Sequence, residues 1–163
     1  MSDFHFVTGT GASTTLLASP IADALAGTIY TDVVSMAQYE EVYFLLSWGV
    51  GASGTTGITV EACDNFTPSN TDAIAFYYKR VSSGETNTAW TAATTSGFTT
   101  TAGSHQAYII RAQAQDLPSV SNVVYENVRL ACVEDTNSPI LAGCLIMMAK
   151  PRYNEATLDA VTS

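Results

Sequence analysis

The fold is decided by the stretch VYFLLSW-GVGASGTTG-ITVEAC, residues 42–63. Two short runs of β-branched, aromatic and aliphatic residues flank a loop rich in glycine, serine and threonine, which is typical of strands and not of helices. In the first run Val42, Phe44 and Leu46 share one face, while Tyr43 and Leu45 share the other. Both faces are largely apolar, so we expect this strand to be covered on both sides.

The same pattern continues outward from this stretch. We count about eight strands, at residues 29–35, 42–48, 58–63, 73–81, 88–92, 106–114, 123–134 and 140–150. No interval between them has helical periodicity, which argues against βαβ units. We therefore predict an all-β fold: a two-sheet antiparallel β-sandwich, jelly-roll-like, with an extended N-terminal arm. The expected organisation is an arm at 1–28, the sandwich domain at 29–153 and a C-terminal tail at 154–163.

The arm contains one local signal. Ser19 and Pro20 are followed by an apolar stretch, residues 21–26, and then by Gly27, which is the form of a capped helical turn. Such a turn is too short to be stable alone. We expect it to dock on a neighbouring subunit.

The charge balance excludes whole classes of partner. The formal net charge is −9, the sequence pI is near 4.3, and no Lys or Arg precedes Lys79. Binding to nucleic-acid phosphates needs the opposite sign, so we expect no nucleic-acid partner. We expect no membrane partner either, because the longest apolar run, 140–149, is far below the roughly 20 residues of a spanning helix. Residues 1–3 do not resemble a secretory signal, which favours assembly in the cytoplasm.

Motifs for catalysis or cofactor binding are weak. Residues 49–54 match GxGxxG, but a dinucleotide loop needs a helix after it, whereas a strand is expected at 58–63, so a hairpin loop is the better interpretation. His5 and His105 lie in no nucleophile context. Asp64 and Asp72 flank a loop that could hold calcium, although ordinary turn chemistry explains them better. We predict no catalytic residues, no cofactor and no metal, and hence no enzyme.

The three cysteines, Cys63, Cys132 and Cys144, form no metal-binding spacing. We expect buried, reduced thiols. Cys132 and Cys144 lie symmetrically about Ser138 in an Asn-Ser-Pro turn signal. A regular hairpin there would place the two thiols nearly opposite each other.

Self-association follows from the apolar outward positions and from the low charged fraction, 13%. The candidate subunit-interface residues are Tyr43, Leu45, Leu145 and Met147. Four aromatic residues could instead form a stacking platform for sugars: Trp48, Trp90, Tyr77 and Tyr78. They alternate with apolar neighbours, which favours a place in the core or in a subunit interface.

The sequence resembles a known family, the small jelly-roll structural proteins of tailed bacteriophages that serve as capsid decoration (auxiliary or cement) proteins. The similarity covers roughly residues 29–153 and lies in these stretches: 29–36 with Tyr39, 41–44, 57–64, 66–68, 73–76, Trp90-Thr91, 97–99, 128–130 and a closing Lys-Pro-Arg-Tyr at 150–153.

The resemblance implies a non-enzymatic virion component on the outer capsid surface. It implies a homo-oligomer, with a trimer as the expected state, that binds the lattice of the major capsid protein and stabilises the head. The acidic pI agrees with an outer location away from packaged nucleic acid. The alternative is a carbohydrate- or receptor-binding β-sandwich module displayed on the phage head or tail.

Overall fold

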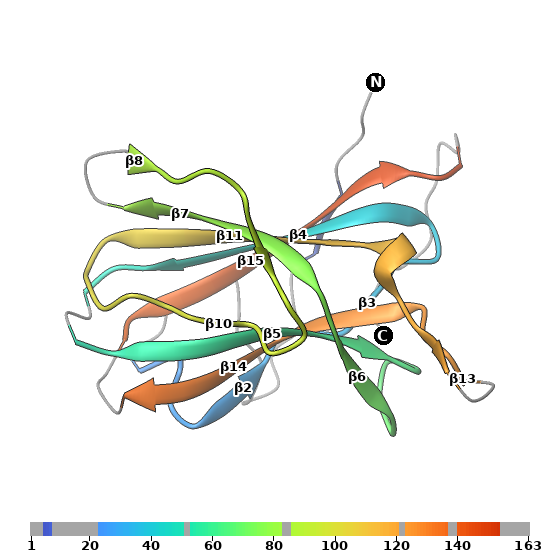
Figure 1. Ribbon diagram of the computed structural model, residues 1–163, viewed down its shortest axis with the longest axis horizontal. Helices are drawn as coiled ribbons and strands as arrows, with labels where there is room; N and C mark the ends of the chain where they lie inside the picture. Colours follow the sequence, from blue (N-terminus) through green and yellow to red (C-terminus); the bar gives the residue numbers. More distant parts are fainter. Residues whose placement is uncertain are drawn as a thin grey trace.

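The computed structural model describes residues 5–7, 23–50, 53–82, 86–120, 123–136 and 140–153. They form two antiparallel sheets packed face to face, seen as two layers in Figure 1. In sheet A the strand order is β1 (His5–Val7), β15 (Ala142–Pro151), β4 (Tyr39–Trp48), β11 (Gln106–Gln113), β7 (Phe76–Ser82) and β8 (Thr86–Asn87), with β9 (Thr91–Ala93) also paired to β7. The predicted all-β, two-sheet antiparallel sandwich is confirmed.

Sheet B has the order β10 (Phe98–Thr99), β5 (Thr55–Cys63), β14 (Asn127–Thr136) and β2 (Thr28–Tyr30), with β6 (Thr71–Ile74) on β5 and β3 (Val34–Ser35) on β14. A third, two-stranded sheet pairs β12 (Ser119–Val120) with β13 (Val123–Val124), and a 3₁₀ turn covers Ala114–Asp116. Several predicted strands are therefore divided into shorter ones.

The core lies between the sheets. Residues on the inward faces of the long strands β4, β5, β11 and β14 are buried there, among them Phe44 and Ile110 from sheet A and Ile58 and Leu130 from sheet B. Burying one such side chain contributes roughly 1.5–3 kcal/mol. The period-two pattern in the sequence thus predicts the inner face correctly. A shift of one residue in strand register would move these apolar side chains from the core to the solvent-exposed face.

Two distant stretches, 39–63 and 127–151, form one long paired ribbon. β4 pairs with β15 in sheet A, and β5 pairs with β14 in sheet B. The connections between them also meet: the Gly49 amide donates to the Leu141 carbonyl at 2.9 Å, and the Leu141 amide donates to the Val50 carbonyl at 3.2 Å. The ribbon therefore continues from one sheet to the other.

Both expected hairpins along this ribbon are wrong. The 49–54 loop joins β4 of sheet A to β5 of sheet B, and the connection after β14 leads back from sheet B to sheet A. Cys132 is paired with Ile58, whereas Cys144 is paired with Leu46. The two cysteines thus lie in different sheets and are not cross-strand neighbours. The Asn-Ser-Pro turn itself, 137–139, lies outside the described residues.

A second correction concerns the predicted strand 73–81. It is interrupted at exposed Ala75, so that β6 belongs to sheet B and β7 to sheet A. Ile74 and Phe76 are nevertheless both buried. The apolar alternation continues across the crossing, which is why the sequence pattern suggests a single strand.

The N-terminal segment contributes to its own domain. Residues 5–7 pair with β15, and Ala24 and Leu25 are buried in the core. The Ala24 amide donates to the Ile140 carbonyl at 2.9 Å. The predicted docking of this turn on a neighbouring subunit is therefore wrong for Ala24 and Leu25. Residues 8–22 of the arm and the tail 154–163 lie outside the described residues.

Candidate functional site: the outer face of sheet A

The four predicted interface residues lie together on the outer face of sheet A. Leu45 is directly opposite Leu145, and Tyr43 is directly opposite Met147, on the neighbouring strands β4 and β15. Leu45 is 37% exposed, and the other three are half-buried. Directly opposed side chains of adjacent strands are in contact distance, so these residues form one continuous apolar patch.

The patch extends across two further strands. Ile109 of β11 is opposite Leu45 on one side and opposite Lys79 of β7 on the other. In the next row, Arg111 is opposite both Tyr43 and Tyr77. The outer face therefore carries two rows that span four strands. The cations lie on β11 and β7, whereas β4 and β15 contribute Leu45, Tyr43, Leu145 and Met147.

Trp90 is brought over this face by a bulge. Arg80 and Thr88 exchange hydrogen bonds, and Tyr78 is opposite Thr91. Two residues, Ala89 and Trp90, therefore oppose the single residue Lys79. Such an extra residue redirects a side chain.

We call Tyr43, Tyr77, Lys79, Trp90 and Arg111 the cation–aromatic cluster. The Arg111 guanidinium lies 5.1 Å from the ring centroids of both Tyr77 and Trp90, and the Lys79 ammonium lies 5.2 Å from that of Trp90. The Tyr43 and Trp90 rings are 6.4 Å apart. Tyr77 is 39% and Trp90 40% exposed, so solvent reaches the cluster. Cations over aromatic faces are attracted by the ring quadrupole.

An ion pair between buried Glu41 and exposed Lys150 lies beside this cluster. The Glu41 side chain is only 3% exposed and accepts hydrogen bonds from Lys150 Nζ at 2.8 Å, Tyr43 Oη at 2.7 Å and Gln113 Nε2 at 3.1 Å. Burial alone would raise the pKa of Glu41, but the hydrogen bonds from Lys150 and Tyr43 outweigh burial and lower that pKa. Burial and the Glu41 carboxylate raise the pKa of Tyr43.

The outer face of sheet B has a different character. Arg129 and Glu61 are directly opposite each other and form a salt bridge of 2.7 Å, and the guanidinium stacks 3.8 Å from the ring centroid of Tyr30. Thr59 and Ala131 form the neighbouring pair, in which Thr59 is half-buried and Ala131 is buried. The cation of this face is therefore neutralised within the chain.

The four aromatic residues considered as a sugar platform divide into two pairs. Trp48 is buried, stacks on Tyr108 at 5.1 Å and donates its indole N–H to the Gly103 carbonyl. Tyr78 stacks on Phe98 at 3.8 Å. Tyr77 and Trp90 instead lie on the outer face of sheet A. They do not form a single platform with Trp48 and Tyr78.

The other candidate sites have structural explanations. The Asp64 carboxylate accepts hydrogen bonds from the Ser69 amide, from the Asn70 amide and side chain, and from the Asn65 side chain, and so closes the loop 64–70. Within that loop the Asn65 side chain accepts a hydrogen bond from the Thr67 amide, which is an Asx turn. Strand β5 follows the GxGxxG loop, as expected. Among the described residues, no group of three His, Cys, Asp or Glu side chains is placed to hold a metal ion.

The three cysteine thiols are buried and free. Burial raises the pKa of Cys63 to about 11 and that of Cys144 to about 12. Burial, followed by the charge of Cys144, raises the pKa of Cys132. A thiol with a raised pKa is a poor nucleophile at neutral pH, so these cysteines act as small core residues.

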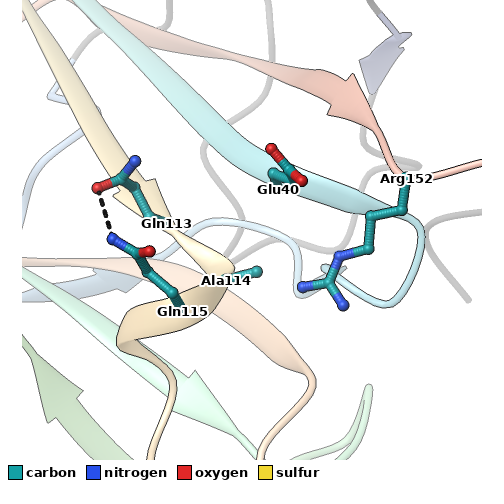
Figure 2. Close-up of a pocket in the computed structure, with 5 residues that line it drawn as sticks. All are labelled: Glu40, Gln113, Ala114, Gln115 and Arg152. Atoms are coloured by element: carbon teal, nitrogen blue, oxygen red, sulfur yellow. Dashed lines mark hydrogen bonds between the residues drawn. The ribbon is translucent and has the colours of Figure 1, made fainter.

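A shallow pocket opens at the end of sheet A, and Figure 2 shows Glu40, Gln113, Ala114, Gln115 and Arg152 around it. The side chains of Gln113 and Gln115 are hydrogen-bonded at 3.4 Å. The pocket offers amide, carboxylate and guanidinium groups to a polar ligand. It contains none of the predicted interface residues.

Sequence reasoning missed the cation–aromatic cluster as a unit. The available signal was the alternation of Tyr77 and Lys79 on one face of a strand, together with Arg111 on another. Their meeting depends on the β7–β11 register and on the Trp90 bulge, which no local pattern indicates.

Within the described part of the chain, no helix is long and apolar enough to cross a membrane. Comparison of the chain with protein-family profiles, with curated proteins and with solved structures found no match.

Proposed function

We propose that this chain is a non-enzymatic structural protein of a tailed-bacteriophage virion, a capsid decoration protein that assembles as a homo-oligomer on the outer surface of the major capsid protein lattice. The observation that carries the proposal is the outer face of sheet A. There the interface residues inferred from sequence, Tyr43, Leu45, Leu145 and Met147, form two opposed pairs in one patch.

This face has the composition of a protein-binding surface. Tyrosine, tryptophan, methionine and arginine are the residue types enriched where proteins associate. Tyrosine, methionine and arginine occur in the two rows that span β15, β4, β11 and β7, and Trp90 lies over Arg111. A net charge of −9 further supports a position on the outer surface, away from packaged nucleic acid. Copies that bridge neighbouring capsid subunits would stabilise the head through multivalent attachment.

The test is reconstitution on capsids that lack the protein. The full chain is mixed with particles assembled from the major capsid protein of the same virus, and co-sedimentation and electron cryomicroscopy locate it. We expect a fixed stoichiometry, density on the outer surface and greater resistance of the particles to heat. Particles that sediment without the protein at micromolar concentration would refute the proposal.

The alternative function, a carbohydrate- or receptor-binding module, is favoured by one observation: Tyr77 and Trp90 present exposed rings on the same face. Aromatic rings stack on the apolar faces of sugars. Glycan-array binding that disappears in Trp90→Ala, with no attachment to capsids, would support this alternative over decoration.

A further inference from the structure

We propose that the outer face of sheet A binds an acidic surface of a second copy of this chain, head to tail, with the cation–aromatic cluster receiving carboxylates of that copy. The inference rests on the proposed function in one respect, the homo-oligomer, and adds the orientation of its contact and the chemistry of the partner surface.

The first argument is the uncompensated positive charge of the cluster. Among the described residues, the salt bridges are Arg129–Glu61 and Lys150–Glu41, and neither involves Lys79 or Arg111. The Nε atom of Arg111 is buried and has no hydrogen-bond partner. Solvent does not reach that atom, but Lys79 and Arg111 are both partly exposed. A carboxylate from outside the chain would reach the Lys79 ammonium and the accessible part of the Arg111 guanidinium, and would supply them with charge-assisted hydrogen bonds.

The second argument excludes a face-to-face contact. A twofold interface places the same patch of both copies together. Depending on the direction of the axis, Lys79 and Arg111 of one copy would then face either the same two cations of the other copy or its aliphatic strands β4 and β15. Neither arrangement offers them a carboxylate, and an unpaired charge buried against apolar side chains is costly. Like charges facing each other across an interface are strongly unfavourable.

The third argument identifies the partner surface. The chain has 15 acidic residues and six basic ones, so without Lys79 and Arg111 four bases remain against those 15 acids. Exposed carboxylates occur at many places away from the cluster, including Asp72, Asp116 and Glu126. The surface of a second copy beyond this face is therefore predominantly negative and complements the cluster. Contacts of this heterologous kind close into rings when the rotation between copies allows it.

The experiment measures the molecular mass of the full-length protein by light scattering and sedimentation over a range of salt and protein concentration. We compare the wild type with Lys79→Glu, with the milder Lys79→Gln and with Arg152→Glu. Arg152 is exposed and lies outside the cluster, so Arg152→Glu is the matched charge reversal. Circular dichroism confirms that each variant is folded.

We expect an oligomer of three or more copies that dissociates as ionic strength rises, because about 1 M salt reduces the Debye length to about 3 Å. Lys79→Glu should weaken association about 100-fold, as expected for an interface hot spot, and Lys79→Gln less. Arg152→Glu should behave as the wild type.

The opposite results are equally clear. A wild-type oligomer that Lys79→Glu leaves intact would overturn this inference and leave the proposed homo-oligomer standing. A wild-type dimer would overturn it too, as would a mixture of wild-type and Lys79→Glu chains that associates more tightly than either chain alone, because that mixture indicates a face-to-face contact. A wild-type monomer under all conditions would refute the homo-oligomer itself.

Discussion

The two sheets of this sandwich bury similar inner faces and expose different outer ones. On sheet A, Leu45 is opposite Leu145, and Arg111 lies among aromatic rings without a salt bridge to any residue that the structure describes. On sheet B, the corresponding cation, Arg129, is neutralised by Glu61 on the next strand. The outer face of sheet B is suited to water, and that of sheet A is suited to a protein partner.

Inward and outward residues of the same strand therefore serve different purposes. The inward residues of β4 and β5 determine that the sheets pack together, and apart from Thr56 they are apolar in both strands. The outward residues are free of that requirement, so their chemistry reflects what the surface meets. Substitutions at outward positions therefore test function with little effect on the core.

The largest effect is expected from an acidic residue in the apolar patch. Leu45→Asp should raise the dissociation constant of the oligomer about 100-fold, since it buries an unpaired charge in the contact. Val133→Asp, at an outward position on sheet B that is 47% exposed, is the matched control and should change association little. Sedimentation equilibrium measures both. Equal effects of the two variants would remove the distinction between the faces.

The next largest effect is expected on the free energy of unfolding, when the ion pair Glu41–Lys150 of sheet A is compared with Glu61–Arg129 of sheet B. In a monomeric Leu45→Asp background, Glu41→Gln should lower the free energy of unfolding by about 2 kcal/mol, since three donors lose a buried charged acceptor. Glu61→Gln on sheet B, where both partners are partly exposed, should cost less than about 1 kcal/mol. Urea unfolding followed by circular dichroism gives both values. A larger loss at Glu61 would contradict the structure.

The pH dependence of the stability lost in Glu41→Gln tests whether the contribution of Glu41 is electrostatic. Because the folded-state pKa of Glu41 is lowered, its stabilisation is complete above the ordinary pKa of about 4.3 and disappears as pH falls through the folded-state pKa. The gap in unfolding free energy between the Leu45→Asp background and the same chain carrying Glu41→Gln should therefore be full at about pH 7 and shrink below about pH 4. A gap that widened on acidification would mean that the pKa of Glu41 is raised.

The smallest effects are expected at the cysteines, where the sheets should behave alike. Cys132→Ala in sheet B and Cys144→Ala in sheet A should each cost about 1 kcal/mol, as a small cavity does. Thiol titration in denaturant without reductant should find three reactive groups per chain. A single reactive group would reveal a disulfide.

Much of the sandwich is predictable from local alternation, because burial of one strand face imposes a period of two on the sequence. That alternation places Tyr43 and Leu45 outside and Phe44 inside, as the structure does. It also selects Leu145 and Met147 as outward residues. It does not predict that Leu145 is opposite Leu45, since register between strands 100 residues apart depends on the whole sheet.

The connections were harder to predict. A glycine-rich loop between two apolar runs looks the same whether the runs pair with each other or face each other from two sheets. The loop at residues 49–54 connects the two sheets, and its first residues are hydrogen-bonded to Leu141, which is distant in sequence. Trp90 is a similar case, because its bulge exists only relative to Lys79 on the neighbouring strand.

The long ribbon formed by 39–63 and 127–151 has a consequence for how the chain reaches its native state. Glu41 and Lys150, which form one of its contacts, are 109 residues apart. Contacts of such separation make folding slow, because loop closure must precede the stabilisation that they provide. During synthesis, β4 and β5 leave the ribosome long before their partners β14 and β15. The apolar strands of the first half must therefore remain soluble, and the absence of positive charge before Lys79 gives this nascent segment a net negative charge that opposes its aggregation.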